Sequence, residues 1–380
     1  MCFVLDAFAP QVGGVETEFA EFTKRLVKRG WDVVVLTSTS CGATGSACLD
    51  GVHVHYFPWR VAFGHPSPRW RDLSPWVAGC DIVHTTTYST ASAALRASRR
   101  HGKPCVLSVQ ECLGRKWFWV EQPWRAAAFY LYERYVVTKP YSAYHAISEA
   151  TRRDLVAAGV ADRLIGMIHL GVDPSGWNPA VSPRDLNGLL GFSDSSRVFL
   201  FTGRAGPTKG ADVLLDAIAM CAGSLPDDVR FGFIMGGHPP GARERFRCRV
   251  EACGLDAIVS VVPSVPHSEL PGYVRAAYCV VVPSITEGFG FCAAEAAALG
   301  ARLITSDAGS LPEVASGRHL LFRNRDAHDL AARLRDACDD RIAETAHVSF
   351  GWDAAAEALL DLYARVLAPT SSAAEQRSHG

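Results

Sequence analysis

The residues best suited to chemistry lie in a glycine-rich segment, 283–290, and in the apolar stretch that follows it. Glu287 stands in the glycine-rich turn, and Glu295 comes eight residues later, among alanines. A buried carboxylate must find a partner, because an unpaired buried charge is costly. Carboxylates also accept hydrogen bonds from hydroxyl groups. The pattern therefore predicts a binding site for a sugar or ribose, and the alternative is that Glu295 lies on a solvated helix face.

A second candidate is the loop 203–210, which begins at Gly203 and follows a predicted strand. Arg204 and Lys209 stand five residues apart in it, among glycines and a proline. Backbone amides, a forked guanidinium and an ammonium together suit a diphosphate. The loop is not a P-loop, because the lysine lacks the required glycine spacing and the following Ser or Thr. A solvated loop with chance cations is the alternative.

The third candidate is the glycine pair Gly13 and Gly14, where the first predicted helix begins. Two glycines let a ligand approach the backbone closely, and a helix N-terminus favours an anion. Because paired glycines are common in turns, a purely structural role remains open at this point.

The elements that must position these residues alternate between strand and helix. The first helix carries Val15, Phe19, Phe22 and Leu26 on one face. Short apolar strands separated by helices predict an α/β protein with parallel, doubly wound sheets. Such sheets bind ligands at the carboxyl ends of their strands, where the candidates lie. The expected strands are 3–5, 33–36, 52–57, 82–84, 105–109 and 144–147, followed by 198–201, 231–235, 258–262, 279–282 and 303–305.

Length and composition predict two domains. A chain of 380 residues with 48% hydrophobic residues can bury two cores of ordinary size. A loop rich in Gly, Pro, Asp and Asn at 171–179 marks the boundary. We expect a first domain at 1–170, a second at 171–350 and a flexible tail at 369–380.

Charge and cysteine content narrow the class of protein. The net charge is -1, but residues 1–168 carry +5 and the remainder -6, which favours an anionic partner for the front half unless the asymmetry is chance. The small basic excess argues against nucleic acid. The twelve cysteines form no CxxC pair, which indicates reduced thiols and a cytoplasmic protein. No stretch reaches the ~20 apolar residues of a membrane span, so membrane contact is expected to be peripheral.

Taken together, these motifs resemble the retaining GT-B glycosyltransferase family, glycosyl transferases group 1, which includes phosphatidylinositol mannosyltransferases and sucrose synthases. The resemblance spans nearly the whole chain and implies two Rossmann-like domains separated by a cleft, with a helix at 352–368 completing the first. The matching features are Gly-Gly-Val-Glu at 13–16, the loop containing Arg204 and Lys209-Gly210, Glu287-Gly-Phe-Gly with Glu295, Ser306 to Glu313, and Phe350-Gly-Trp352 with Leu359 and Tyr363.

The resemblance also implies roles for individual residues. Arg204 and Lys209 would neutralise the diphosphate of a UDP- or GDP-sugar, Glu295 would bind its ribose, and Glu287 would contact the transferred sugar. The donor site would be completed by the glycine-rich backbone, namely Gly13, Gly14, Gly203, Gly288, Phe289 and Gly290. The family is usually independent of metal, and the chain has no Asp-x-Asp motif. No cofactor is expected.

One position departs from the family. After the strand at 105–109 relatives commonly carry His followed by an acidic residue, whereas this chain has Gln110 and Glu111. Glutamine can hydrogen-bond a sugar hydroxyl but cannot take a proton. In a front-face retaining mechanism the departing phosphate oxygen can accept that proton, so Gln110 does not exclude catalysis. It leaves open a catalytically impaired, sugar-nucleotide-binding subunit; an epimerase is a further alternative.

The acceptor is expected to be a hydroxyl of a glycan, a lipid-linked sugar or a small metabolite. Residues 113–144 interleave ten aromatic residues with five cations, a combination typical of a membrane interface. This motivates the hypothesis of peripheral contact with an anionic membrane at its inner face. The alternative is that the aromatic residues pack in the core of the first domain or line an acceptor cleft.

Overall fold

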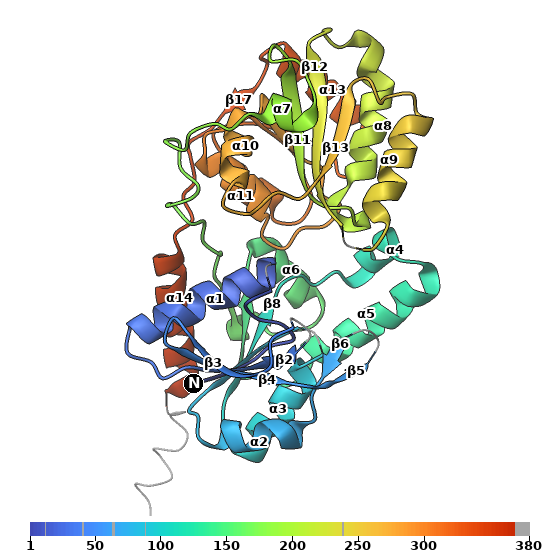
Figure 1. Cartoon of the computed structure of the whole chain (residues 1–380). Coiled ribbons are helices and arrows are strands. Elements are labelled where there is room, and N and C mark those ends of the chain that lie inside the picture. The colour runs from blue at the N-terminus through green and yellow to red at the C-terminus, as the bar shows by residue number, and fades with distance from the viewer. Residues whose placement is uncertain (12, 40–41, 63–64, 88, 238, 369–380) are drawn as a thin grey trace, which may run out of the picture. The chain divides into compact units, whose positions relative to one another are not determined.

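The computed structural model describes residues 1–11, 13–39, 42–62, 65–87, 89–237 and 239–368. The chain forms two compact units, each an α/β sandwich (Figure 1). Unit 1 comprises Met1–Arg115, Trp124–Gly171 and Gly351–Gly380, and unit 2 comprises Lys116–Pro123 and Val172–Phe350. Residues 116–123, inside the range 1–170 expected for the first domain, thus cluster with unit 2. The tail expected at 369–380 lies outside the described residues.

Unit 1 is built on an eight-stranded sheet in the order β10-β9-β8-β7-β1-β2-β4-β3. Every neighbouring pair is parallel except β3 and β4, which are antiparallel. Parallel strands present their carboxyl ends at one edge, so the loops that follow them gather there. The strands are β1 (Cys2–Val4), β2 (Val34–Ser38), β3 (Gly45–Leu49), β4 (Val52–Phe57), β7 (Val83–Thr86), β8 (Cys105–Val109), β9 (Ala143–Ala146) and β10 (Ile165–Met167), with a separate hairpin of β5 (Arg60–Ala62) and β6 (His65–Ser67).

Helices cover both faces of this sheet, because successive strand residues point to opposite sides. Phe3 packs edge-on against Phe19 of one helix, whereas Cys2 and Val4 belong to the core under other helices. The expected face of the first helix is confirmed, since Phe19, Phe22 and Leu26 are fully buried. The helices are α1 (Gly14–Lys28), α2 (Trp70–Ala78), α3 (Ala91–Arg100), α5 (Pro123–Val137), α6 (Glu149–Ala157) and α14 (Trp352–Leu367).

Unit 2 repeats the architecture with a seven-stranded sheet in the order β13-β12-β11-β14-β15-β16-β17. Only the β16–β17 pair is antiparallel among the described strands. The phenylalanines of β11 and β12 alternate inward and stack in pairs, with ring centroids 5.5 Å apart for Phe199 and Phe231. The strands are β11 (Arg197–Arg204), β12 (Val229–Gly236), β13 (Val259–Pro263), β14 (Cys279–Val282), β15 (Leu303–Ser306), β16 (Arg318–Phe322) and β17 (Ala343–Glu344).

The helices of unit 2 also lie on both sides of its sheet (Figure 1). On one side α8 packs against α13, and both contribute leucines to the phenylalanine-rich core. The helices are α4 (Trp117–Val120), α7 (Leu186–Leu190), α8 (Ala211–Cys221), α9 (Ala242–Ala252), α10 (Leu270–Ala276), α11 (Phe291–Ala298), α12 (Leu311–Val314) and α13 (Ala327–Cys338).

The expected α/β fold with two parallel sheets is therefore confirmed, and each expected strand is present with bounds shifted by at most a few residues. Six strands were missed: the hairpin strands β5 and β6, and the sheet strands β3, β10, β16 and β17. The edge strand β3 is mostly exposed and β17 has only two residues, so neither carries the apolar run that announces a buried parallel strand. No described helix is long and apolar enough to cross a membrane.

Candidate functional site

Three loops of unit 2 meet at the carboxyl edge of its sheet. They follow β11, β14 and β15, which are neighbours or near neighbours in the sheet. The loop after β14 is tied to the loop after β11, because the Ile285 amide donates to the Thr208 carbonyl over 2.7 Å. It is tied to the loop after β15 as well, because the Ser310 amide donates to the Glu287 carbonyl over 3.2 Å. The expected donor-binding loops are thus one connected structure.

Lys209 and Glu287 form an ion pair at the centre of this structure. The Lys209 Nζ atom lies 2.7 Å from Glu287 Oε2, and both side chains are largely buried. The Ser284 hydroxyl donates to the same carboxylate oxygen over 2.9 Å. Two charge-assisted hydrogen bonds fix the carboxylate, so an ammonium and a carboxylate lie preorganised side by side. Both residues were named in the sequence analysis, in two separate motifs, but it was not predicted that they form a pair.

Two glycines permit the close approach of these loops. At Gly210, whose φ is +68°, an added Cβ atom would lie 1.8 Å from the Pro283 carbonyl oxygen. At Gly309, whose φ is +52°, it would lie 2.2 Å from the Glu287 carbonyl oxygen. Any side chain would push the loops apart, because such distances are far below van der Waals contact and the backbone conformation itself disfavours L-residues. Both glycines are therefore required to hold Lys209 and Glu287 in register.

Glu295 lies in α11 and is half-buried. Burial raises the pKa of its carboxyl to about 8. No described side chain or amide forms a hydrogen bond or ion pair with it. Burial raises the pKa of the neighbouring Cys292 thiol, and the charges of Lys209, Glu295 and Glu287 also influence it, so all three charged groups lie near this thiol. A desolvated carboxyl without a protein partner is suited to accept hydrogen bonds from a ligand.

The N-terminus of α11 completes the arrangement. Gly290 caps the helix in a left-handed conformation with φ of +93°. Phe289 is buried and packs edge-on against Phe291 and Phe350, which anchors the turn from below. Within the described chain the amides of Gly288 and Gly290 donate to no protein acceptor, and the helix dipole makes such amides attractive to an anion.

Arg204 ends β11 and is exposed. Its aliphatic stem lies beside Gly236 at the end of β12. A Cβ atom added to Gly236 would lie 3.9 Å from Arg204 Cγ. Its guanidinium has no partner among the described residues. Gly203 lies beside the aliphatic stem of Lys209, because a Cβ atom added to Gly203 would lie 3.9 Å from Lys209 Cγ. Both residues thus stand at the same strand end as Lys209, with the Arg204 charge still available.

In unit 1 the glycine pair begins α1, as expected. Gly13 is the N-cap residue and Gly14 the first helical residue. A Cβ atom at Gly13 would lie 2.3 Å from a carboxylate oxygen of Glu16. The Glu16 carboxylate therefore folds back over the helix N-terminus, so an anion bound there would have to displace it. The sequence did not anticipate this competitor.

Gln110 follows β8 and is 8% exposed. It lies against Glu18 of α1, which is completely buried. Burial raises the pKa of the Glu18 carboxyl to about 8, while Gln110 and Ser108 oppose the rise. The buried Glu18 Oε2 and Gln110 Nε2 atoms nevertheless make no hydrogen bond of good geometry with any described group. Gln110 thus has a loosely held amide at the carboxyl edge of the sheet.

Glu18 also begins a buried polar network that the sequence did not reveal. Ser108 bridges two histidines, at 2.8 Å from His145 Nδ1 and 2.8 Å from His84 Nε2. Tyr363 of α14 hydrogen-bonds His84 from the other side. Burial lowers the pKa of His145 to about 4 and that of His84 well below its usual value. Both rings are therefore neutral near pH 7, and the network ties α14 to the sheet of unit 1.

One signal for Glu18 was available in the sequence. It stands three residues after Val15 and four before Phe22, on the apolar face of α1. This spacing was not used in the sequence analysis to predict that the Glu18 carboxylate is buried. The partners His84, Ser108 and Tyr363 are separated by up to 279 residues, and no local pattern connects them. Gly309 and Ser284 lie inside motifs that were named in the sequence analysis. Their contacts with Glu287 could not be predicted, because they depend on which loops come together in the fold.

The aromatic segment divides between two environments. Tyr141 and Tyr144 are buried, and the Tyr144 hydroxyl donates to backbone carbonyls. The other large apolar side chains with notable exposure are Phe118, Trp119, Trp124, Leu131, Tyr132 and Tyr135, at 44% to 71% of their surface. The core packing considered in the sequence analysis therefore holds for part of the segment only.

The two sheets and the loop cluster define a GT-B-type glycosyltransferase. Comparison with protein families agrees: the model of glycosyl transferases group 1 matches residues 189–349, and that of glycosyltransferase family 4 matches residues 12–175. The chain belongs to this glycosyltransferase family.

Curated relatives and solved structures support the assignment. A D-inositol 3-phosphate glycosyltransferase of Nocardioides is 30% identical over 94% of this chain and 86% of its own length. Another, of Streptomyces avermitilis, is 33% identical but aligns over only 52% of this chain and 46% of its own length. Sucrose-phosphate synthase of Thermosynechococcus elongatus shares the fold with a TM-score of 0.77 at 19% identity, covering 97% of this chain and all of that one. Anabaena HepE, solved with UDP-glucose, does so with 0.68 at 18% identity, covering 100% and 99%.

Proposed function

We propose that the chain transfers a sugar from a nucleotide-sugar donor to an acceptor hydroxyl, with retention of the anomeric configuration. The observation that carries the proposal is the Lys209–Glu287 pair, held beside the N-terminus of α11 and beside Glu295, whose carboxyl has no partner among the described residues. Cation, carboxylates and amides stand together there, as the diphosphate, ribose and sugar of such a donor require. Anabaena HepE, which shares the fold, was solved with UDP-glucose. A UDP-sugar is accordingly the first donor to test, and a GDP-sugar the second.

Each residue has a defined task in this proposal. Lys209 and Arg204 neutralise the diphosphate and stabilise it as it leaves, since ammonium and guanidinium groups bind phosphate oxygens strongly. Glu295 accepts hydrogen bonds from the two ribose hydroxyls. Glu287, fixed by Lys209 and Ser284, holds the transferred sugar. The amides of Gly288, Phe289 and Gly290 bind the sugar or phosphate, with Gly203 leaving room for the diphosphate.

Retention follows if the acceptor attacks from the face that the diphosphate leaves. The bond between the anomeric carbon and the phosphate oxygen breaks, the bond to the acceptor oxygen forms, and the acceptor proton passes to the departing phosphate. No protein base is needed in this step. Gln110 then hydrogen-bonds a sugar hydroxyl, for which its loosely held amide is suited. The glycine pair Gly13 and Gly14 contributes backbone contacts once Glu16 has turned away.

We propose that the reaction needs no metal ion or cofactor, because Lys209, Arg204 and the α11 N-terminus supply positive charge to the leaving group. Activity should persist in excess EDTA. Eleven cysteines are free in the described part of the chain, which supports a reducing, cytoplasmic location.

For the acceptor we propose a glycan, lipid-linked or small-molecule hydroxyl, presented in part at an anionic membrane surface. The exposed aromatic side chains of α5, together with the exposed cations Arg125 and Arg134 of the same helix, support this. Helix α4 separately exposes Phe118 and Trp119. Flotation with anionic and with zwitterionic liposomes tests it. Floating only with anionic liposomes is expected, and failure to float with either would exclude membrane contact.

The transfer itself is tested by incubating the chain with UDP- and GDP-sugars and candidate acceptors, and by measuring nucleotide release and the anomer formed. Acceptor-dependent release of one nucleotide, with the α-product from an α-donor, is expected. Lys209→Ala should reduce this rate at least tenfold, and Arg243→Ala, which removes a partly exposed cation from α9, is the control. Tight donor binding without transfer to any acceptor would instead favour a binding subunit with the GT-B fold. Interconversion of the donor sugar without transfer would favour an epimerase.

A further inference from the structure

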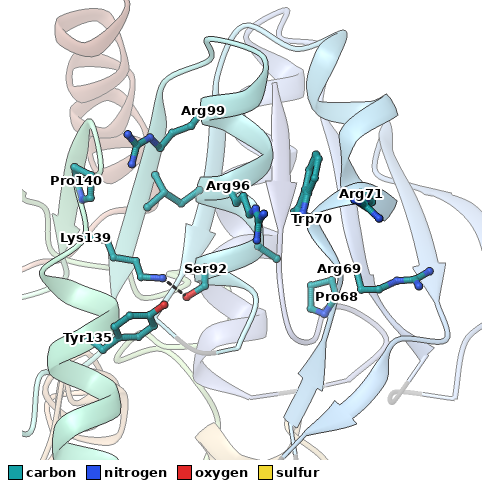
Figure 2. A pocket seen from close by; sticks show the side chains of 12 residues that line it. Pro68, Arg69, Trp70, Arg71, Ser92, Arg96, Arg99, Tyr135, Lys139 and Pro140 are labelled. Atoms are coloured by element: carbon teal, nitrogen blue, oxygen red, sulfur yellow. Dashed lines mark hydrogen bonds between the residues drawn. The ribbon is translucent and has the colours of Figure 1, made fainter.

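Unit 1 contains a cavity that the proposed reaction does not use. It encloses about 690 Å³ between the start of α2, one face of α3 and the end of α5 (Figure 2). Five cationic side chains and two aromatic rings line it. We call it the basic pocket and define it by Arg69, Trp70, Arg71, Arg96, Arg99 and Lys139.

The cations from α3 share a face because of their spacing. Ser92, Arg96 and Arg99 stand at positions i, i+4 and i+7, which lie above one another on a helix. The sequence of α3 contains no acidic residue, so no intrahelical partner neutralises the arginines. Arg96, Arg99 and Lys139 all line the pocket, and Figure 2 shows the Arg96 side chain extending from α3 toward Trp70 and that of Arg99 leaving the same helix on the side of Pro140. The helix therefore presents a row of positive charge to the pocket.

Most of this charge is uncompensated. Arg69 pairs with Asp72 over 3.1 Å. Lys139 donates to the Ser92 hydroxyl over 2.9 Å and lies 3.9 Å from the centroid of the Tyr135 ring. By contrast, Arg71, Arg96 and Arg99 have no carboxylate within 4.0 Å in the described part of the chain, and no acidic residue lines the pocket.

Trp70 holds two of the guanidinium groups in place. The Arg96 Cζ atom lies 5.2 Å from its ring centroid and that of Arg71 5.6 Å. A guanidinium stacked on an aromatic ring keeps its N–H edge free for a second ligand. Because contact with the Trp70 ring already restricts the Arg71 and Arg96 side chains, they lose less conformational entropy when a ligand binds. The two guanidinium groups are therefore preorganised to bind an anion.

The basic surface continues beyond the pocket. A second hollow of about 510 Å³ shares Trp70 and Arg71 and adds Arg100 and His101. Within the pocket itself, the exposed Tyr135 ring of α5 adds apolar surface to the lining. A ligand with a phosphate group and an apolar or sugar portion would match both parts of this surface.

We propose that the basic pocket binds the phosphate group of a phosphorylated small molecule or lipid headgroup. A phosphate accepts the bidentate hydrogen bonds that two neighbouring arginines offer, and Lys139 adds a third cation. The site lies in unit 1, whereas the proposed donor diphosphate binds residues of unit 2, and the inference does not depend on the proposed sugar transfer. The +5 charge of residues 1–168 points to the same class of ligand.

The experiment uses the full chain and two probes. The soluble probe is sn-glycerol 3-phosphate in isothermal titration calorimetry, and the membrane probe is cosedimentation with phosphatidylglycerol-containing vesicles against phosphatidylcholine alone. The test variant is Arg96→Gln/Arg99→Gln. The control is Arg153→Gln/Arg163→Gln, which removes the same charge from exposed positions of unit 1. Lys209→Ala reports any binding at the proposed donor site.

If glycerol 3-phosphate binds wild type, control and Lys209→Ala alike but the test variant at least tenfold more weakly, the ligand is a soluble phosphate. If only phosphatidylglycerol vesicles bind, and the test variant alone loses them, it is a lipid headgroup. Binding of neither probe, or equal binding by the test variant, overturns the proposal. Should the double variant fail to fold, Arg99→Gln alone, which breaks no recorded contact, must still lose several-fold in affinity.

Discussion

Replacing Glu18 by glutamine should stabilise the protein, and increasingly so as the pH rises. Glu18 is fully buried in unit 1, and burial raises the pKa of its carboxyl from 4.5 to about 8. Below about pH 4.5 the carboxyl is protonated in both the folded and the unfolded chain, so it adds no pH dependence. Between about pH 4.5 and pH 8 the unfolded chain gives up the proton and the folded chain keeps it. The free energy of unfolding therefore falls as pH rises through this window.

The size of the effect follows from the displacement of the pKa. One pKa unit corresponds to about 1.4 kcal/mol, so the folded state loses on the order of 5 kcal/mol by pH 8. The amide that replaces the carboxyl in Glu18→Gln cannot ionise. Its carbonyl oxygen can still accept the hydrogen bond that the Ser108 hydroxyl gives to Glu18. The variant should thus escape the loss.

Urea denaturation of wild type and Glu18→Gln at several pH values between about 5 and about 8 measures this. A probe in unit 1 is needed, because the two units can unfold separately. The matched control is Glu357→Gln, which removes an exposed carboxylate from α14. We expect the stability gain of Glu18→Gln to widen with pH by several kcal/mol. A gain that stays constant or shrinks as pH rises would refute the argument, because it would mean that Glu18 is ionised in the folded chain.

Two further predictions concern unit 2. Gly210→Ala should lower the stability of unit 2 by several kcal/mol and abolish donor binding, because the new Cβ atom would meet the Pro283 carbonyl oxygen at 1.8 Å. The control is Gly206→Ala, because nothing lies within 4 Å of a Cβ atom added there. Chemical denaturation compares the stability of the two variants, and nucleotide titration compares their donor binding. Affinity for the nucleotide should rise as pH increases through about 8, since the Glu295 carboxyl then ionises and becomes the stronger acceptor for ribose hydroxyls. Calorimetric titrations should show this dependence in the wild type and not in Glu295→Gln, and a flat wild-type profile would argue against contact between Glu295 and the ribose.

The sequence predicted the parallel sheets because their strands are short, continuously apolar runs. Residues 105–109 and 279–282 were located to the residue for this reason. Local chemistry also explains the start of α6, where the Ser148 hydroxyl oxygen accepts a hydrogen bond from the Thr151 amide, as is typical of a serine N-cap. Strands without an apolar run escaped notice, as β3 shows.

The site was predictable only as separate motifs. Lys209 and Glu287 are 78 residues apart, and nothing local shows that the ammonium bonds the carboxylate. Their meeting depends on strand order, which places β14 beside β11, and on two glycines that let the loops touch. The same limit applies to the basic pocket, whose arginines lie on two helices and whose lysine follows a third.

The most direct test of the central account is a thermal-shift panel of UDP, GDP and ADP with their common sugar conjugates. It is run on the wild type, Arg204→Ala, Glu295→Ala and the control Arg243→Ala. Ligand binding stabilises the folded chain by mass action, by about 2.7 kcal/mol at a concentration one hundred times the dissociation constant. We predict a rise in melting temperature with one nucleotide in the wild type and the control, lost in both site variants. No rise with any nucleotide, or an equal rise in all four proteins, would contradict a donor site at these loops.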